Sequence, residues 1–445
     1  MKFNTIGRIT EKFIEIESKQ NLFNWDIKGI KVYQLLRHKI YFAALDTHIK
    51  KDKTFIKNSK NVFKKIISRL PQVKNFLFYS PLNDTKGSDY LLFESSRKQL
   101  IEGNFADPFT KFIKDDLIKR NKNFTIYQSS YFYDKLAEKD RNTKHLDRVY
   151  LLAEYKAKRY KLEFTENELE EISSTGDFIN NELGLKIDFL SMVKSEISSF
   201  IVLSKFFSII LENKKPKTIY IVNFCDKAAL INECKKRKIE VVDIQHGLMS
   251  DNDVIYNYPK VEKGTVDYFP DKFYAWSDIW LGNCTLPISS DKIEIVENQT
   301  LIASVKKYKG IEKQKNKVLI ISQDTITDQI LSSVSDIVDN NPELDFYFKP
   351  HPNEYSYINS LNKFQELSSK RNFSMVPQTA NLYELFAQSK NVIGVYSAAL
   401  IEALYFGCNV FILNLPGSEM MDYLLQSKKM KSIKDFNTLV KSQLN

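Results

Sequence analysis

The sequence predicts an α/β protein with two Rossmann-like domains and a helix-rich N-terminal extension. Apolar runs alternate with helical patterns between residues 217 and 276, and the same alternation restarts at 317 and continues to 413. Near-continuous apolar runs of this kind are typical of parallel strands buried on both faces. A polar, lysine-rich stretch at 297–316 separates the two blocks. We therefore expect an N-terminal domain at 1–300 and a C-terminal domain at 301–445.

The first 212 residues are expected to be largely helical, with a few short strands. Residues 1 to about 70 have a helical pattern with interleaved aromatic side chains. Within them, the basic segment 24–41 suits an acceptor-binding insertion or a membrane contact, or else a packed amphipathic helix with Trp25, Leu35 and Leu36 in the core. Strand-like runs follow at 75–80, 89–95 and 124–130, and helical patterns at about 146–212.

The two alternating blocks can be divided into elements. The first contains the strands "KTIYIVNF" (217–224), "IEVVDIQHG" (239–247) and "KFYAW" (272–276), with a helix at 226–238 between the first two. The second contains strands at 317–322, 345–350, 391–397 and 409–414, and helical patterns at 325–339, 354–370, 381–389 and 398–406.

Composition narrows the class of protein. The 445 residues carry a net charge of +10, and lysines concentrate at 50–65. No nucleic-acid-binding signature accompanies this run, which favours a solvated surface or contact with a membrane or an anionic substrate over nucleic acid. Four cysteines without metal-ligand spacing favour a reducing compartment. The N-terminus lacks the pattern of a signal peptide, and the apolar stretch 200–211 is too short to span a bilayer. We expect a cytoplasmic protein, at most peripheral to the inner face of the cell membrane.

Ligands of open parallel sheets bind beyond the carboxyl ends of the strands, so the ends of the apolar runs are the first places to look. The first such end is Gln245-His246-Gly247. A histidine titrates near neutral pH and can take a proton from a hydroxyl group. Gly247 would let the backbone turn and leave room for a substrate. The alternative is a histidine that only satisfies a hydrogen bond at a strand end.

The second end is Lys349-Pro350-His351-Pro352. Two prolines hold the backbone rigid around the histidine. Lys349 and His351 are therefore candidates for contact with phosphate, although a rigid turn without a ligand is also consistent with this pattern.

At the third end, Ser397 is predicted to cap a helix whose small first residues, Ala398 and Ala399, leave N–H groups open for phosphate. Glu402 could reach a ribose or sugar hydroxyl, and Gly407 is expected to end the helix. A purely structural cap would use the same residues. Taken together, the three ends predict a two-domain cleft with a base on one wall and phosphate-binding groups on the other. Asp251-Asn252-Asp253 superficially resembles a metal-binding triplet but is interpreted as loop chemistry, so neither a metal nor another cofactor is expected.

The ordered set QHG, KPHP and S-x-x-x-x-E-A-L with a following glycine resembles the GT-B glycosyltransferases of bacterial capsule and lipopolysaccharide biosynthesis. The nearest resemblance is to β-Kdo transferases. Polysialyltransferases share an HP motif, and teichoic acid glycerophosphotransferases share HG and HP. The resemblance covers roughly residues 215–417.

The resemblance implies an inverting, metal-independent transfer from a nucleotide-activated sugar, with a cytidine nucleotide as the first guess. The acceptor would be a glycan or a lipid-linked oligosaccharide. It implies that His246 acts as base or lies close to the reaction centre, that His351 contacts the donor phosphate, and that Ser397 and Glu402 lie at the phosphate and the ribose or base. The single serine at Tyr396-Ser397-Ala398 departs from the paired serines of the teichoic acid enzymes, which argues against a polyol-phosphate donor.

Two other functions remain open from the sequence. One is a nucleotide-sugar 2-epimerase, which would carry several acidic residues and histidines around the cleft, whereas this chain has only five histidines. The other is a non-catalytic partner in polysaccharide assembly, against which the intact histidines and Ser397 argue.

Overall fold

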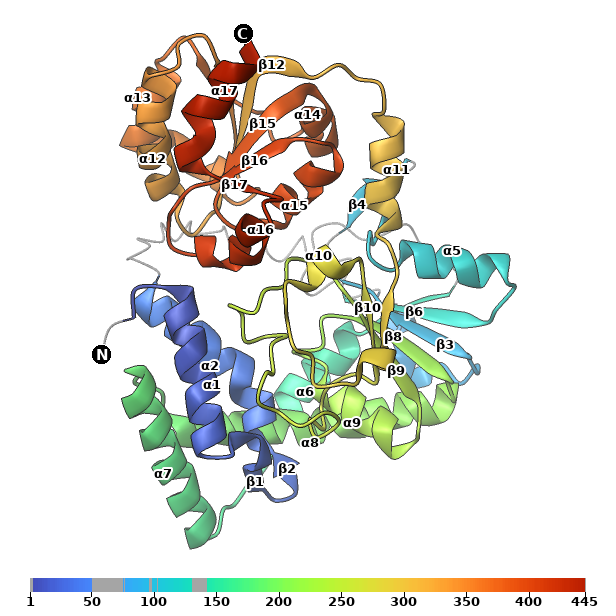
Figure 1. The fold of residues 1–445 in the computed structure, drawn as a ribbon. Coiled ribbons are helices and arrows are strands. Elements are labelled where there is room, and N and C mark those ends of the chain that lie inside the picture. Colours follow the sequence, from blue (N-terminus) through green and yellow to red (C-terminus); the bar gives the residue numbers. More distant parts are fainter. Residues whose placement is uncertain are drawn as a thin grey trace.

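A computed structural model describes residues 3–49, 75, 77–95, 98–101, 103–129 and 142–444. It contains two parallel α/β sheets and a helical N-terminal extension (Figure 1). The second sheet is formed by the second block of the sequence and the residues after it, whereas the first sheet combines the first block with strands from residues 90–145 and 293–295. The predicted fold class, two Rossmann-like domains, is confirmed.

The N-terminal sheet has the strand order β11-β10-β9-β8-β3-β6-β7, and all of its neighbours are parallel. Its strands are β3 (Tyr90–Phe93), β6 (Phe124–Gln128), β7 (Thr143–His145), β8 (Thr218–Val222), β9 (Glu240–Ile244), β10 (Lys272–Ala275) and β11 (Ile293–Ile295). Because every strand runs the same way, the residues that follow β3, β6, β8 and β9 meet at one carboxyl edge.

The C-terminal sheet has the order β14-β13-β12-β15-β16-β17 and is also parallel throughout. Its strands are β12 (Gln314–Ile321), β13 (Asp345–Lys349), β14 (Phe373–Met375), β15 (Ser389–Gly394), β16 (Asn409–Ile412) and β17 (Lys431–Ser432). The helices of this half are α12 (Thr327–Asp339), α13 (Asn362–Ser368), α14 (Leu382–Gln388), α15 (Ala398–Tyr405), α16 (Asp422–Gln426) and α17 (Phe436–Leu444).

Helices α1 (Ile6–Lys19) and α2 (Val32–His48) form the N-terminal extension, with the two-stranded hairpin β1 (Asp26–Ile27) and β2 (Ile30–Lys31) between them. Trp25, Leu35 and Leu36 are all buried, so segment 24–41 is packed in the core as the last alternative predicted, but it is helical only from Val32 on. The other helices of this half are α5 (Lys111–Lys119), α6 (Asp147–Lys158), α7 (Glu166–Leu183), α8 (Phe189–Lys214), α9 (Ala228–Lys236) and α10 (Asp278–Leu281), and a small hairpin pairs β4 (Gln99–Ile101) with β5 (Asn104–Ala106).

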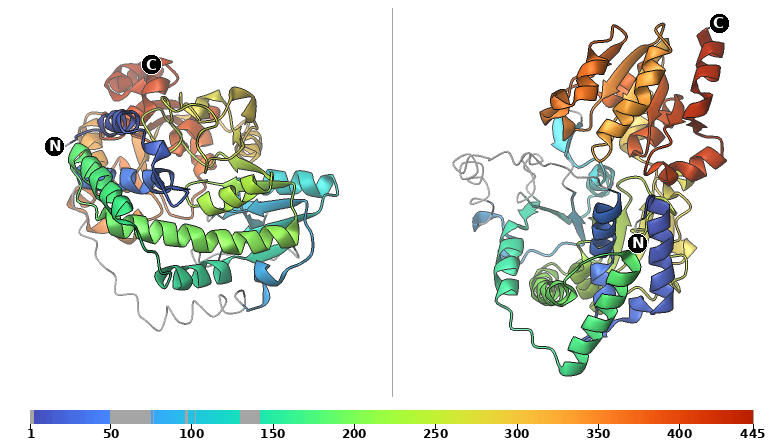
Figure 2. Two further views of the ribbon diagram at one scale, coloured as in Figure 1. Left: turned by 90° about the horizontal axis from the view of Figure 1, so that it is seen from below. Right: turned by 90° about the vertical axis from the view of Figure 1, so that its left-hand side faces the viewer.

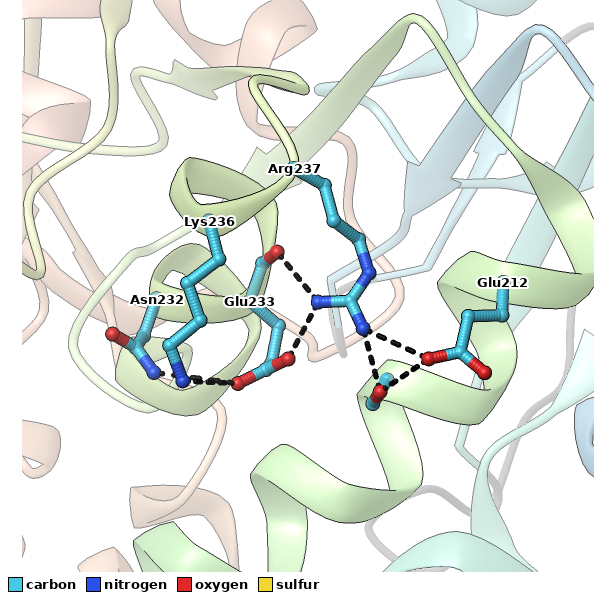
Figure 3. Close-up of polar contacts among 6 residues, drawn as sticks. Glu212, Asn232, Glu233, Lys236 and Arg237 are labelled. Atoms are coloured by element: carbon cyan, nitrogen blue, oxygen red, sulfur yellow. Dashed lines mark hydrogen bonds and ion pairs between the residues drawn. The ribbon is translucent and has the colours of Figure 1, made fainter.

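Among the described residues, α8 is the longest helix, and it packs against α2, α6, α7 and α9 (Figures 1 and 2). A polar network on its surface joins it to the end of α9 (Figure 3). Arg237 donates to Glu233 Oε2 at 2.6 Å and to Glu212 Oε1 at 3.0 Å, and so bridges the two helices. The contact joins α9, the helix that connects β8 to β9, to α8. Within the described ranges, no helix is both long enough and apolar enough to cross a membrane.

Several predicted elements differ from the structure. The strand predicted at 75–80 is wrong: residues 75, 77 and 78 are helical, and Ser80 caps a 3-10 turn. The stretch 297–316 contains helix α11 (Gln299–Lys307), because Asn298 caps it and Leu301 is buried. The helix predicted at 354–370 is two 3-10 turns followed by the shorter α13. The lysine-rich run 50–65 lies outside the described residues.

Candidate active site

The turn after β9 is held by the side chain of Gln245, which is only 1% exposed. Its amide nitrogen donates to Trp280 O at 2.6 Å and to Gly247 O at 3.2 Å, and its Oε1 accepts from Trp276 N at 2.9 Å. Both ends of the amide are therefore engaged with the chain. Gln245 ties the end of β9 to the segment after β10 and fixes the backbone on either side of His246.

The ring of His246 is half-buried between two aromatic rings. Its centroid lies 6.3 Å from that of Phe109, edge to face, and 6.3 Å from that of Tyr256. Tyr256 donates its hydroxyl to Asp243 Oδ2 at 2.9 Å, and Asp243 is fully buried. Burial raises the pKa of Asp243 to about 7. The carboxyl group of Asp243 thus titrates near neutral pH and bonds Tyr256, whose ring neighbours the candidate base His246.

Gly247 has open space beside it. A Cβ atom added at this position would meet no heavy atom within 4 Å, and its φ lies in the range that other residues adopt. The backbone therefore does not require a glycine here, and the room that the sequence predicted is present.

A buried cluster that sequence reasoning missed lies at the same edge. Lys98 Nζ bonds Glu94 Oε2 and lies 3.8 Å from Asp107 Oδ2, and Gln128 Nε2 donates to Glu94 Oε2 at 2.7 Å. The side chains of Glu94 and Lys98 are 6% and 3% exposed. Burial raises the pKa of Glu94, although the Lys98 charge acts in the opposite direction. No local motif signals this cluster, because its members come from separate strands and a hairpin.

The loop after His246 forms a junction between the two domains. Asn252 Nδ2 donates to the backbone oxygen of Glu419 at 2.9 Å, and Thr10 in α1 donates to Asn252 O at 2.8 Å. The Glu419 carboxylate accepts from Ile6 N at 2.5 Å and Gly7 N at 3.3 Å, where an acidic group stabilises the start of α1. The segment Asp251-Asn252-Asp253 is thus part of a loop, and Asn252 in it bonds both the C-terminal domain and helix α1.

In the C-terminal domain, the turn after β13 is fixed by Glu354, which is fully buried. Its carboxylate accepts from Ser322 Oγ at 2.7 Å, from Thr327 Oγ1 and from His351 N. Asn353 N donates to His351 Nδ1 at 3.3 Å, so the ring proton of the neutral form belongs on Nε2. A glutamate three residues after the position it bonds is the spacing of a capping box, and this signal in "HPNE" could have identified Glu354.

Lys349 is oriented differently from the prediction. Its Nζ donates to Tyr355 Oη at 2.9 Å, and Tyr355 donates to Val376 O at 2.7 Å. Burial lowers the pKa of Lys349. Its ammonium group is therefore engaged with the β14 side of the sheet.

The turn after β15 behaves as a cap. Ser397 Oγ accepts from Ala399 N at 3.3 Å, and Ser397 O accepts from Leu400 N at 2.9 Å. Ser397 itself therefore accepts from two of the first N–H groups of α15. The expectation that these groups are open is wrong. Ala398 is half-buried. Glu402 Oε1 accepts from Tyr383 Oη at 3.4 Å and so faces α14.

The first and third motifs are linked across the domains. The loop 415–421 carries Glu419, which bonds Asn252, and Gly417, where an added Cβ would lie 2.2 Å from the ring of Tyr396. Tyr396 directly precedes Ser397. Two further bonds cross the interface, Ser277 Oγ to Tyr405 Oη at 3.1 Å and Tyr423 Oη to Ile279 O at 2.8 Å. The turns after β9 and β15 therefore face one interdomain region. His351 follows β13, two strands from β15 and about 10 Å away.

In the part of the chain that the structure describes, no group of three or more His, Cys, Asp or Glu side chains could hold a metal ion.

Comparison with solved structures finds loose similarities of architecture. They include the UDP-GlcNAc 2-epimerase of Methanocaldococcus jannaschii (TM-score 0.46, 12% identity, 80% of this chain and 91% of that one) and that of Neisseria meningitidis bound to UDP-GlcNAc (0.46, 15%, 79% and 91%). MurG of Acinetobacter baumannii is also similar (0.44, 9%, 80% and 90%). No protein-family model and no curated protein matches the sequence.

Proposed function

We propose that the chain is an inverting, metal-independent glycosyltransferase of bacterial surface polysaccharide biosynthesis. It would move a sugar from a nucleotide-activated donor, in the first instance CMP-linked, to a glycan or lipid-linked acceptor. The observation that carries this proposal is the junction that joins the His246 turn to the Tyr396–Ser397 turn through Asn252, Glu419 and Gly417. This junction supports the proposal because it connects the turn of a candidate base on one sheet to the turn of a candidate phosphate site on the other.

In this proposal His246 takes the proton from the acceptor hydroxyl, whose oxygen attacks the anomeric carbon as the bond to the nucleotide phosphate breaks. Gln245 is a positioning residue, since its amide is bonded to the chain on both sides. Gly247 leaves room for the reacting sugar. Residues 1–300 would then provide the acceptor side.

Residues 301–445 would hold the donor. The Nε2–H of His351 would donate to a phosphate oxygen, and the remaining N–H at Ala398 would do the same at the start of α15. Ser397 shapes that turn. For Lys349 and Glu402 to reach phosphate and ribose, their present bonds to Tyr355 and Tyr383 must open, so we expect both to contribute less than His351.

The decisive experiment is a thermal-shift panel with CMP, CDP, UDP, GDP and UMP, run with and without EDTA. A ligand at 100 times its Kd stabilises the folded state by about 2.7 kcal/mol, which is readily measured. We expect one nucleotide to stabilise the protein selectively, with EDTA present, and His351→Ala to abolish the shift. Absence of any shift would support a non-catalytic assembly partner, and a shift that requires a divalent metal would contradict the metal-independent mechanism.

A second candidate function is a nucleotide-sugar 2-epimerase. The buried carboxylates Glu94 and Asp107 beside Lys98 favour it, since epimerisation needs acidic groups that exchange protons at a carbon atom. Turnover of a UDP-sugar without any acceptor would establish this function, whereas transfer that depends strictly on an acceptor would exclude it.

The proposed place of action is the cytoplasm, with peripheral contact at the inner face of the membrane. All four cysteines are free in the structure, which fits a reducing compartment. Fractionation of cells that express the tagged chain would test this.

A further inference from the structure

A buried ion pair joins the two helices of the N-terminal extension, α1 and α2, which lie side by side (Figure 1). Arg37 Nε donates to Glu17 Oε1 at 2.7 Å, and Arg37 Nη2 donates to Glu17 Oε2 at 3.2 Å. Each side chain is only 5% exposed. Apolar side chains of similar size often stabilise a core as well as such a pair does, because burial removes both charges from water. The packing of α1 on α2 alone therefore does not require the pair.

The remaining donors of Arg37 are directed at the loop that follows His246. Arg37 Nη1 donates to Val254 O, and Arg37 Nη2 donates to Asn257 O at 2.9 Å. The guanidinium carbon lies 4.0 Å from the ring centroid of Tyr258, a favourable position for a cation on an aromatic face. One planar guanidinium thus bonds a carboxylate and two backbone carbonyl groups at once, a set of contacts that its fixed fork of donors suits.

The two carbonyl groups flank Tyr256, whose ring neighbours that of His246. Tyr256 is 6% exposed, its ring centroid lies 6.3 Å from that of His246, and its hydroxyl donates to Asp243. Aromatic rings at this separation interact, and the energy depends on their relative orientation. Because Arg37 bonds the chain two residues before Tyr256 and one residue after it, the guanidinium restrains the backbone that carries this ring.

The two ends of this short segment are not held equally. Asn257 has further bonds through its own side chain, which donates to Asp251 O at 2.7 Å and accepts from Thr285 N at 3.0 Å. Val254 O accepts from Arg37 and, at 3.3 Å, from Asn257 N within the same segment. Loss of the Arg37 contacts should therefore free the start of the segment more than its end.

We propose that Arg37 is a positioning residue for His246 and acts through the backbone of residues 254–257 and the ring of Tyr256. The inference rests on the proposed function for its effect on transfer, and it goes beyond that function by giving the N-terminal extension a part in the reaction centre. The extension is then needed for the geometry of the candidate base as well as for the fold.

The test compares Arg37→Lys with the wild type in the full chain. Lysine keeps the positive charge and can bond Glu17, but a single ammonium group cannot also reach both carbonyl groups in the geometry of a guanidinium. The ring of His246 is observed by NMR of histidine labelled at Cε1, and its signal is identified by its loss in His246→Gln. We expect Arg37→Lys to change the Cε1–H chemical shift of His246. Its titration midpoint should move by about 0.5 pH unit or more, within the spread of about 1 unit that folded proteins impose on histidine.

Transfer assays give a second readout of the same variant. Arg37→Lys should lower kcat about 10- to 100-fold, since a small misplacement of a catalytic group costs that much, and should leave KM for the donor unchanged.

Tyr33→Phe is the matched control. The Tyr33 hydroxyl donates to Glu17 Oε1 at 2.7 Å in the same buried network, but in the described chain it is not bonded to residues 254–257. Its removal should lower the melting temperature and leave the His246 signal and kcat as in the wild type. An equal change of the His246 signal in Tyr33→Phe would show that any loosening of the extension reaches His246, and it would overturn the specific role of Arg37.

A second variant covers the case in which Arg37→Lys does not fold. Glu17→Leu/Arg37→Met replaces the pair by apolar side chains, which is often neutral or stabilising, and removes both donors to the loop. It should stay folded, as its melting temperature reports, and still change the His246 signal. A folded double variant with the wild-type His246 signal and titration would overturn the proposal, and so would an unchanged signal in Arg37→Lys.

The NMR measurement needs no substrate, so its result is independent of the proposed function. An altered His246 signal in the variants, together with a wild-type chain that shows no transfer, would keep Arg37 as the residue that positions His246 and reject the glycosyltransferase.

Discussion

The carboxyl edges of the two sheets are built in different ways. At the C-terminal edge, one buried carboxylate, Glu354, meets three donors, from Ser322, Thr327 and His351. At the N-terminal edge, the buried carboxylate of Glu94 is paired with Lys98, and two buried hydroxyls, of Tyr127 and Ser129, have no hydrogen-bond partner in the described chain. At the C-terminal edge the buried carboxylate has its hydrogen-bond partners within the protein. At the N-terminal edge some buried polar groups have none in the described chain.

This difference matches the two tasks in the proposed reaction. A nucleotide phosphate has the same shape in every donor, so a rigid turn held by Glu354 and by Ser397 can be preorganised for it. The acceptor sugar must bring its own hydrogen-bonding groups, and the N-terminal edge leaves groups for it to meet. The comparison predicts that variants at the N-terminal edge affect transfer and acceptor binding, whereas variants at the C-terminal edge affect stability and nucleotide binding.

The largest expected effect is that of His246→Ala. Loss of a general base should lower the rate of transfer by about 10² to 10⁴, with nucleotide binding and melting temperature unchanged. His246→Gln keeps a polar side chain but cannot carry the proton, so it should be as inactive. Rates are measured with saturating donor. An active His246→Gln variant would show that another residue is the general base, and Glu94 would be the first to test.

The next effect concerns pH and Asp243. Burial raises the pKa of Asp243 to about 7, so the folded chain retains a proton that the unfolded chain has released. A raised acid pKa means that stability is greatest at low pH and falls as pH rises through the folded value. Between pH 5 and pH 8 this group should cost about 3 kcal/mol of unfolding free energy.

Asp243→Asn can still accept from Tyr256 and cannot ionise, so its urea-unfolding free energy should decline less over that range. The exposed Asp278→Asn is the control and should decline like the wild type. If Asp243→Asn follows the wild type, the carboxyl group is not the source of the pH dependence, and the support it gives to Tyr256 and His246 does not change with pH.

At the opposite edge, Glu354→Ala should cost about 2 to 3 kcal/mol, because three donors lose their acceptor. Glu354→Gln keeps an acceptor for Ser322 and Thr327 but turns an amide N–H toward His351 N. It should therefore cost less stability and still weaken nucleotide binding. Urea unfolding and the thermal-shift panel measure the two effects, with the exposed Glu343→Ala, expected within about 0.5 kcal/mol, as control. A Gln variant with normal nucleotide binding would show that the His351 turn does not need Glu354.

The two edges also differ in how far the sequence predicts them. At the C-terminal edge the information is local: two prolines fix the backbone around His351, and Ser397 caps α15 as its type and position predict. Even Glu354, which was missed, lies three residues from the position it holds. Strands β12, β13, β15 and β16 were found for the same reason, since each is a compact apolar run.

At the N-terminal edge the information is distributed. Glu94, Gln128 and Lys227 lie on segments more than 30 residues apart, and only the strand order β9-β8-β3-β6 brings them together. The order of the strands in a sheet depends on tertiary packing, and the hydrophobic periodicity of the sequence carries no information about it. The short strands β7, β11, β14 and β17 were missed because two or three residues carry no period. The orientation of Lys349 toward Tyr355 depends on a contact that no motif indicates.

The smallest expected effect on stability is that of Gly247→Ala, and Gly282→Ala at the other side of the same loop provides the contrast. At Gly282, φ is +59° and an added Cβ would lie 1.9 Å from Met249 O, so Gly282→Ala should destabilise the protein by several kcal/mol. At Gly247 an added Cβ meets nothing within 4 Å, so Gly247→Ala should leave the unfolding free energy unchanged or raise it by up to about 1 kcal/mol. If the acceptor lies against the His246 turn, the extra methyl group should nevertheless lower transfer at least tenfold while nucleotide shifts stay normal. Full transfer by Gly247→Ala would mean that no substrate approaches this turn, and the reaction centre would then lie away from the His246 turn.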